Sequence, residues 1–423
     1  MRGTSFPCWR RYPPPDPRYN LAASTGTEKH RNQQSLTNLL SQFLGTVKGD
    51  LANVTGPPSL LAPSSVVEVG HCWAQRPAVF AAPALEPDAE KRSLLVLRWF
   101  LIALRSQLYV GGAPQVCIKK PLNAFLGELF FASWTDDEAK ATAKLVAEQV
   151  SHHPPITAMH IVDEDHGIRA DGYARVEMTF NGNVNIRQVG HAMVHIDKYD
   201  EDHLVPLPDV KVRGFLSGCM YPEIIGPYTI SSSSGYTTEL KFSGEGIIRG
   251  KRNTFEARIF SKDDPEQKSI YTASGIWSDG WTVKDARSGE TLENYVVDAP
   301  ENTPVPIQVD SLAEQDPWES RKAWQGVLSG IQYRDMRQVM AEKTKIEQAQ
   351  RQMRVVEKQR EETWTPLLFK SIPSEEHDVF HELCEGTDMT LDSERTKGVW
   401  RLDGDGLRGL QRPFRGDLTP LGY

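Results

Sequence analysis

The amino-acid sequence predicts a β-dominated α+β fold built around one large antiparallel sheet. Between residues 173 and 285, short runs with period-two alternation recur, separated by Gly, Asp and Ser turns. This region lacks the helix-strand-helix alternation that is typical of a nucleotide-binding α/β fold. After residue 320, a long charged segment of strong helix formers replaces the strand pattern. Many short strands followed by helices indicate a sheet that curls or closes, with helices at its flanks.

Composition sets the limits of the prediction. The 423 residues, 39% hydrophobic and 25% charged, can bury a large core and allow two or three domains. A formal net charge of −8 argues against general affinity for nucleic acid, so any anion site must be local. The five cysteines are scattered and contain no Cys-x-x-Cys, which favours reduced thiols in the cytosol over a disulfide framework or a zinc site.

The N-terminal part divides into two segments. Residues 1–33 carry consecutive prolines and few large aliphatic side chains, so we predict a disordered tail. Residues 34–63 contain a short amphipathic helix followed by glycines that supply breaks or hinges. From its pattern alone, this helix could pack on the core, insert shallowly into a bilayer or close a pocket. Its apolar positions are Leu36, Leu39, Leu40, Phe43, Leu44 and Val47.

Two further helices are predicted before the strands begin. Residues 93–107 show helical spacing of apolar side chains and end before Gly111-Gly112. The same apolar run is interrupted by Arg98 and Arg105, so no membrane span is predicted. Residues 139–150, rich in Ala, Lys and Glu, predict a second helix.

A β-hairpin is the strongest local prediction. Residues 173–180 and 183–186 alternate in polarity on either side of Asn181-Gly182, a pair that accepts the positive φ of a tight turn. Further runs with strand character follow at 190–196, 228–232, 237–242, 246–248, 254–260, 269–277 and 281–285.

The C-terminal part is predicted to be helical. Residues 320–362 contain no proline and predict two helices or one long bent helix, and a short helix is expected within 365–391. We therefore divide the remaining chain into residues 64–315, which hold helices and the β-barrel, and residues 316–423, a helical subdomain packed on the barrel.

Residues 148–156, Glu-Gln-Val-Ser-His-His-Pro-Pro-Ile, carry the most unusual chemistry. Pro154 keeps His153 out of the helical region, so the two imidazoles are presented from a stiff, extended segment. His152 and His153 could bind a ligand, ligate a metal, act as acid and base, or simply meet water. The sequence supplies no recognisable third metal ligand, nucleophile or phosphate-cradling glycine loop, so neither a metal nor a cofactor is predicted.

The same residues resemble the signature of the oxysterol-binding protein family. Residues 119–128, Lys-Lys-Pro-Leu-Asn-Ala-Phe-Leu-Gly-Glu, are similar to another family segment, although Ala124 replaces its usual proline. Residues 319–324, Glu-Ser-Arg-Lys-Ala-Trp, and the charged helix after them also resemble the family. The resemblance covers roughly residues 35–365 and is strongest to short members, such as the yeast homologues, that consist of the lipid-binding domain alone.

The resemblance implies a fold and a function. It implies an incomplete antiparallel β-barrel that encloses a lipid tunnel under an N-terminal amphipathic lid, the helix at 36–47. It also implies a monomeric lipid-transfer protein that exchanges a sterol, or a phospholipid such as phosphatidylserine, for phosphatidylinositol 4-phosphate. Such a protein breaks no bond, so it is not an enzyme, and it binds no nucleic acid. It would be cytoplasmic and transiently attached to membranes, those of the Golgi and endoplasmic reticulum in this family. A lipid sensor or scaffold and a metal-dependent hydrolase that uses the histidine pair are the alternatives.

The resemblance also assigns site residues. The phosphoinositide headgroup would be bound by Lys120, Leu122, Asn123, His152, His153, Lys343, Glu347 and Arg351, with Glu128 in support. A phosphomonoester carries up to two negative charges and suits such donors. Lys343, Glu347 and Arg351 are spaced i, i+4 and i+8 on one helical face, although solvated ion pairs would produce the same spacing.

Gln107 is the candidate for the tunnel itself. By resemblance it would lie near the hydroxyl of a bound sterol, but Leu108 follows it where an aromatic residue is expected. A role as an ordinary helix-surface residue stays open for Gln107.

Overall fold

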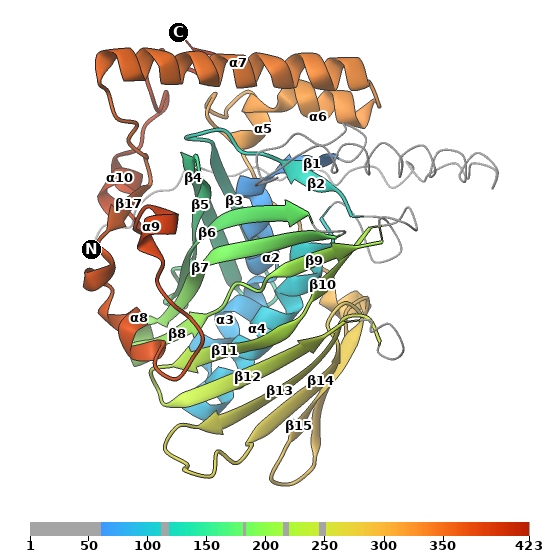
Figure 1. Ribbon diagram of the computed structural model, residues 1–423. Helices are drawn as coiled ribbons and strands as arrows, with labels where there is room; N and C mark the ends of the chain where they lie inside the picture. Colours follow the sequence, from blue (N-terminus) through green and yellow to red (C-terminus); the bar gives the residue numbers. More distant parts are fainter. Residues whose placement is uncertain (1–60, 111–117, 181–182, 215–219, 245–250, 423) are drawn as a thin grey trace, which may run out of the picture.

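The protein is described by a computed structural model that covers residues 61–110, 118–180, 183–214, 220–244 and 251–422. The predicted disordered tail, the lid helix at 36–47 and the strand at 246–248 lie outside these residues. Within them, one large antiparallel sheet of 14 strands curls around a group of helices (Figure 1). The predicted fold class, a β-dominated α+β fold with an incomplete barrel, is therefore confirmed.

The described strands are β1 (Leu61–Ser65), β2 (Lys120–Leu122), β3 (Leu129–Asp136), β4 (Ala141–His152), β5 (Pro155–Asp163), β6 (Ile168–Phe180), β7 (Val184–Ile196), β8 (Glu201–Val205), β9 (Val210–Arg213), β10 (Tyr221–Ile224), β11 (Gly226–Ser232), β12 (Tyr236–Ser243), β13 (Thr254–Ser261), β14 (Tyr271–Ile276), β15 (Gly280–Asp285), β16 (Thr291–Val296), β17 (Phe369–Ile372) and β18 (Val399–Leu402). The described α-helices are α2 (His71–Ala74), α3 (Pro77–Leu85), α4 (Ala89–Leu108), α5 (Ser320–Ala323), α6 (Gln325–Gln332), α7 (Met336–Arg360), α8 (Asp378–Leu383), α9 (Ser393–Thr396) and α10 (Gly404–Gly409). Short 3₁₀ segments include η2 (Val66–Gly70).

The strand order explains why the barrel is incomplete. The main path of the sheet runs β16-β15-β14-β13-β12-β11-β8-β7-β6-β5-β4-β3, and β9 pairs with both β7 and β10. Neighbours along this path are antiparallel and follow one another closely in sequence. Among the described strands, β3 and β16 end the path without pairing with each other. The sheet thus curves far enough to form a hollow but leaves its two edges apart.

The predicted hairpin is formed by β6 and β7. Their register runs without a bulge from Ile168↔Ile196 to Phe180↔Val184, and the Asn-Gly pair at 181–182 falls between the strands. Thirteen consecutive pairs make this the longest ladder in the sheet, as the strong alternation and turn signal indicated.

The predicted helix at 139–150 is wrong, because this segment is strand β4. One face of β4 presents Ala143 and Leu145 to the core inside the curl, and the other face presents Val146 and Val150 to a second core outside it. A strand buried on both faces loses the period-two alternation that identifies strands in sequence. Its Ala, Lys and Glu content then favours a helix locally, and tertiary packing overrides that preference.

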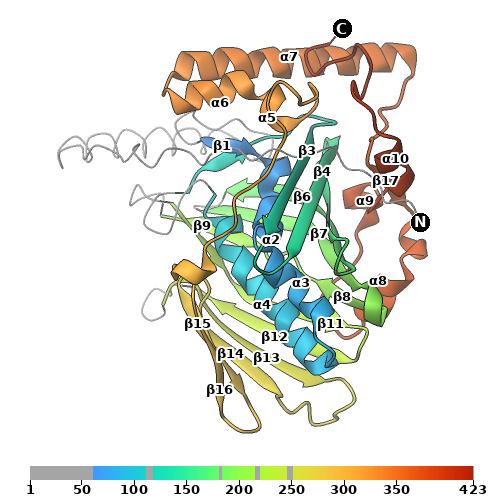
Figure 2. The same cartoon turned by 180° about the vertical axis from the view of Figure 1, so that it is seen from behind.

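Helices α2, α3 and α4 lie within the curl of the sheet (Figure 2). The predicted helix at 93–107 forms the larger part of α4, whose first turn is capped by Asp88 accepting a hydrogen bond from Glu90 N at 3.0 Å. Val96, Phe100 and Leu104 pack into the inner core with side chains of the sheet. Within the described residues, no helix combines the length and the apolar content needed to cross a bilayer.

The predicted helical region at 320–362 forms α5, α6 and α7. Helix α7 is 25 residues long and lies across one end of the molecule, with α6 between it and the sheet (Figures 1 and 2). Its Val339 and Ile346 share the second core with Val146 and Ile156 of the sheet. The C-terminal segment and the sheet are therefore joined by one hydrophobic core.

Candidate functional site

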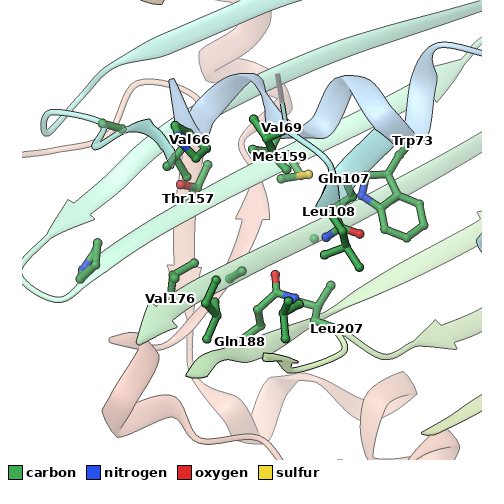
Figure 3. Close-up of a pocket in the computed structure, with 18 of the residues that line it drawn as sticks. Val66, Val69, Trp73, Gln107, Leu108, Thr157, Met159, Val176, Gln188 and Leu207 are labelled. Atoms are coloured by element: carbon green, nitrogen blue, oxygen red, sulfur yellow. The ribbon is translucent and has the colours of Figure 1, made fainter. Parts of the chain in front are cut away.

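The curled sheet and its inner helices enclose a mainly apolar cavity of about 330 Å³. This volume falls within the range of roughly 300–1,000 Å³ that is usual for small-molecule sites. Figure 3 shows side chains from η2, α4 and the strands converging on it. Ala170, Gly172 and Ala192 also line it, and their small size leaves space along β6 and β7. The apolar side chains labelled in the figure are Val66, Val69, Trp73, Leu108, Met159, Val176 and Leu207.

Gln107 stands out among the polar groups of this cavity. Gln149 accepts a hydrogen bond from Thr157 Oγ1 at 2.6 Å, and Gln188 donates one to the carbonyl oxygen of Pro208 at 2.6 Å. By contrast, Oε1 of Gln107 is buried and has no hydrogen-bond partner within the described part of the chain. Figure 3 shows Gln107 beside Leu108 at the cavity wall. A buried acceptor without a partner is costly, so this position suits a ligand that brings a donor.

The segment around β2 adds cationic and polar groups to the same cavity. Lys119, Lys120 and Asn123 line it, as does Ala124. Leu122 is fully buried in the second core and is not among the lining residues, so it anchors the β2 segment to that core. Two lysines and an amide thus border a mainly apolar cavity.

The two histidines are held against this segment. Strand β4 ends at His152 and β5 begins at Pro155, so the His-Pro pair forms the turn between adjacent strands. Nδ1 of His152 lies 3.0 Å from the carbonyl oxygen of Ala124, and the ring centroids of His152 and His153 are 4.6 Å apart. The Ala124 contact therefore connects the histidine turn directly to a residue of the cavity wall.

Helix α7 carries the remaining predicted site residues. Lys343 is buried and forms an ion pair with Glu347, whereas the Arg351 side chain is 77% exposed and lies 3.9 Å from Glu347. Burial lowers the pKa of His152, and the charges of His153 and Arg354 lower it further, while the Ala124 carbonyl and Glu347 oppose the shift. Glu347 and Arg354 are therefore close enough to act on the histidine ring. Of the predicted α7 residues, Arg351 is the one that remains mainly in solvent.

Arg354 was missed by the sequence prediction. Its Nη2 donates to Glu357 at 2.6 Å and its guanidinium lies 4.9 Å from the ring centroid of Trp364. Its Nε and Nη1 are buried and have no hydrogen-bond partner among the described residues. A signal existed in the sequence, because Arg354 follows Lys343 by eleven residues, about three helical turns, and so shares its face.

Two buried carboxylates near the predicted site residues form hydrogen bonds to the C-terminal part of the chain. Glu128 accepts a hydrogen bond from Trp324 Nε1 at 2.9 Å, and Glu148 accepts hydrogen bonds from the backbone N–H groups of Leu367 and Leu368. Burial raises the pKa of each carboxyl group to about 7. Glu128 thus contacts α5 rather than the cavity, and Glu148 fastens the C-terminal segment to the strand that presents the histidines.

No group of three or more His, Cys, Asp or Glu side chains that could hold a metal ion occurs within the described ranges. Lys120 and Asn123 line the cavity, His152 contacts Ala124 of its wall, and Lys343 is a buried, ion-paired cation of α7.

Comparison with known proteins identifies the family. The family model described as oxysterol-binding protein matches residues 36–329, which is more than half of the chain. The chain belongs to the oxysterol-binding protein family. The predicted resemblance is therefore confirmed, and the cavity described above lies within the matched region.

Two relatives illustrate the relationship. This family member is 47% identical over 380 residues to the probable transporter efuK of Hormonema carpetanum, a match that covers 89% of the chain but only 54% of the relative. It is 34% identical over 330 residues to the protein kes1 of Schizosaccharomyces pombe, covering 77% of the chain and 84% of the relative.

Solved structures share the fold. The Osh1 ORD domain in complex with ergosterol has a TM-score of 0.65 at 18% identity, covering 88% of this chain and 87% of that one. The Osh3 ORD of Saccharomyces cerevisiae in complex with PI(4)P has a TM-score of 0.63 at 17% identity, covering 80% and 88%. At these identities the similarity establishes the architecture and leaves the ligand to be argued from the site.

Proposed function

We propose that this family member binds one lipid in its cavity and exchanges it for phosphatidylinositol 4-phosphate between membranes. The observation that carries the proposal is an apolar cavity that is lined by Lys119, Lys120 and Asn123 and connected to the histidine turn by the His152–Ala124 contact. The complexes of Osh1 with ergosterol and of Osh3 with PI(4)P support both ligand classes for this fold.

The cavity supports the apolar part of the proposal. Each methylene of a lipid transferred from water to such a wall contributes about 0.8 kcal/mol, so the hydrocarbon supplies most of the binding energy. The buried amide of Gln107 would accept or donate a single hydrogen bond within this wall. A sterol, with one hydroxyl on a rigid hydrocarbon, matches this pattern, and a phospholipid such as phosphatidylserine is the second candidate.

The border of the cavity supports the phosphoinositide. Lys120 and Asn123 reach it from β2, and His152 and His153 lie in the turn fastened to Ala124. Lys343 is a buried cation whose partner is Glu347, and an incoming phosphate would offer it further negative charge. Because the headgroup and the other lipid's hydrocarbon would meet at one cavity, we expect the two lipids to exclude each other.

A two-vesicle assay tests this function. Donor vesicles would carry labelled phosphatidylinositol 4-phosphate and acceptor vesicles labelled sterol, and the protein should carry the two lipids in opposite directions. The double variant His152→Ala and His153→Ala should lose phosphoinositide transfer. His381→Ala is the control, because this exposed histidine lies on α8, where its Nε2 is 2.9 Å from the Ser374 carbonyl oxygen, and it is not among the residues that line the cavity.

The results separate the alternatives. Phosphoinositide transfer at the native rate by the double variant would reject the assigned site. Binding of both lipids without equilibration of the vesicle pools would instead favour a sensor or scaffold.

The family resemblance implies that the protein serves membranes of the Golgi and endoplasmic reticulum. It also implies that the active form is a cytoplasmic monomer.

A further inference from the structure

Helix α7 has two different faces. Its buried residues Val339, Lys343, Ile346 and Met353 point toward the body of the protein. The opposite face lies on the outside of the molecule, since α7 is the outermost element at its end of the fold (Figures 1 and 2). We call the exposed residues of α7 its outer face. They are Arg337, Met340, Ala341, Lys345, Gln348, Arg351, Gln352, Val355, Lys358, Gln359 and Arg360.

The outer face carries positive charge and no acidic residue. It holds five Lys or Arg side chains in a chain whose formal net charge is −8. The glutamates of α7 are only partly exposed, and each is paired with a cation of the helix: Glu342 with Lys345, Glu347 with Lys343, and Glu357 with Arg354. Exposed acidic residues flank the helix: Asp335 precedes it, and Glu361 and Glu362 follow it. The positive charge is therefore a local feature of this surface.

The same surface exposes apolar side chains. Eight large hydrophobic residues are exposed in the described part of the chain, and four of them lie on or next to α7. Tyr333, 74% exposed, lies three residues before the start of the helix, and Met340 and Val355 belong to it. Leu421 lies near the inner flank of the helix, because Gln350, which shares the face of Ile346 and Met353, donates through Nε2 to the carbonyl oxygen of Pro420 at 3.0 Å. Exposed apolar side chains between cations are typical of a helix that lies at a membrane surface.

We propose that the outer face of α7, together with Tyr333, docks on an anionic bilayer. Charge complementarity selects this partner, because Lys and Arg side chains are attracted to the negative lipid surface. The helix spans about 37 Å at 1.5 Å per residue, so it could lie flat along the surface. The inner side of the same helix carries Lys343, which is paired with Glu347, and the charges of Glu347 and Arg354 act on the His152 ring. Docking would therefore hold the candidate headgroup site next to the lipids. The proposal builds on the proposed function, because a lipid carrier must meet a bilayer to load.

Cosedimentation with vesicles that contain no phosphoinositide tests docking on its own. Phosphatidylcholine vesicles would be compared with vesicles of phosphatidylcholine and phosphatidylserine. The double variant Arg337→Gln and Lys358→Gln should bind the anionic vesicles about thirtyfold more weakly, from the loss of two surface cations. Lys241→Gln with Lys284→Gln makes the same charge change at exposed positions of β12 and β15 and should bind like the native protein.

Salt and the hydrophobic residues give independent checks. Native binding should weaken as salt is raised, because screening shortens the range of the attraction. Tyr333→Ser should weaken binding without changing its salt dependence. Equal binding to neutral and anionic vesicles, or native affinity in the Arg337 and Lys358 variant, would overturn the proposal.

Docking and lipid binding can fail separately. Sterol delivered from cyclodextrin needs no bilayer, so the Arg337 and Lys358 variant should bind it normally. The His152 and His153 variant should dock normally but lose phosphoinositide. If the Arg337 and Lys358 variant binds sterol normally but transfers lipid slowly, the result supports docking by the outer face. Loss of phosphoinositide transfer in the histidine variant tests the proposed function and not the docking surface.

Discussion

Replacing Gln107 with Leu should have opposite effects on the empty protein and on its complex with a hydroxylated lipid. In the native protein, Oε1 of Gln107 is buried in a mainly apolar wall and has no hydrogen-bond partner among the described residues. A buried unsatisfied polar group costs about 1–3 kcal/mol, so Leu should raise the free energy of unfolding of the empty protein by about 1 kcal/mol. The affinity for a sterol should fall by about tenfold, because the hydrogen bond between its hydroxyl and Gln107 contributes about 1.4 kcal/mol.

A pair of sterols isolates this single hydrogen bond. Cholesterol and cholestane, which lacks the hydroxyl, would be delivered from cyclodextrin to the native protein and to the Leu variant. The native protein should prefer cholesterol, and the variant should lose most of that preference while binding cholestane at least as well. Gln188→Leu is the control, because the Gln188 amide already donates to Pro208 and should not set the ratio. An unchanged preference in the Gln107 variant would refute the assignment.

Three further predictions concern charge. Arg354→Gln should weaken binding of a soluble short-chain phosphatidylinositol 4-phosphate about tenfold, because it removes charge-assisted donors, while the exposed Arg408→Gln should not. The pKa of His152 lies below its usual value in the empty site, so binding of a phosphate dianion should be accompanied by uptake of a proton. Isothermal titration should therefore show that the affinity for the phosphoinositide rises as the pH is lowered from neutral. The rise should be smaller in His152→Gln. Because the pKa of Glu148 is raised to about 7, the folded state keeps a proton that the unfolded chain loses above about pH 4.5. The free energy of unfolding should therefore fall as the pH rises toward about 7. Denaturant unfolding of Glu148→Gln should show a smaller fall over this range.

The parts of the fold that were predicted correctly are those with local signals. The β6–β7 hairpin carries period-two alternation and an Asn-Gly turn, and both act between residues close in sequence. Strand β4 was missed because its burial depends on two cores, one of which is completed by residues more than 170 positions away, such as Trp324. No window around β4 contains that information.

The site residues were likewise predicted only where the signal lies within a short stretch of sequence. The lysine and asparagine of the β2 segment and the histidine pair occur in short contiguous motifs, and the structure links these motifs through the His152–Ala124 contact. Arg354 was missed because its buried N–H groups and its stacking on Trp364 become visible only after α7 and the following segment have folded together. The lid helix at 36–47 stays a prediction, because it lies outside the described residues.

Displacement of one lipid by another tests the central claim most directly. Protein loaded with a fluorescent sterol would be titrated with soluble phosphatidylinositol 4-phosphate, and the bound quantity of each lipid would be measured after separation from free lipid. If the cavity and its cationic border form one site, each phosphoinositide bound should release one sterol. Simultaneous binding of both lipids to the same molecule, or failure of the phosphoinositide to release any sterol, would contradict the account.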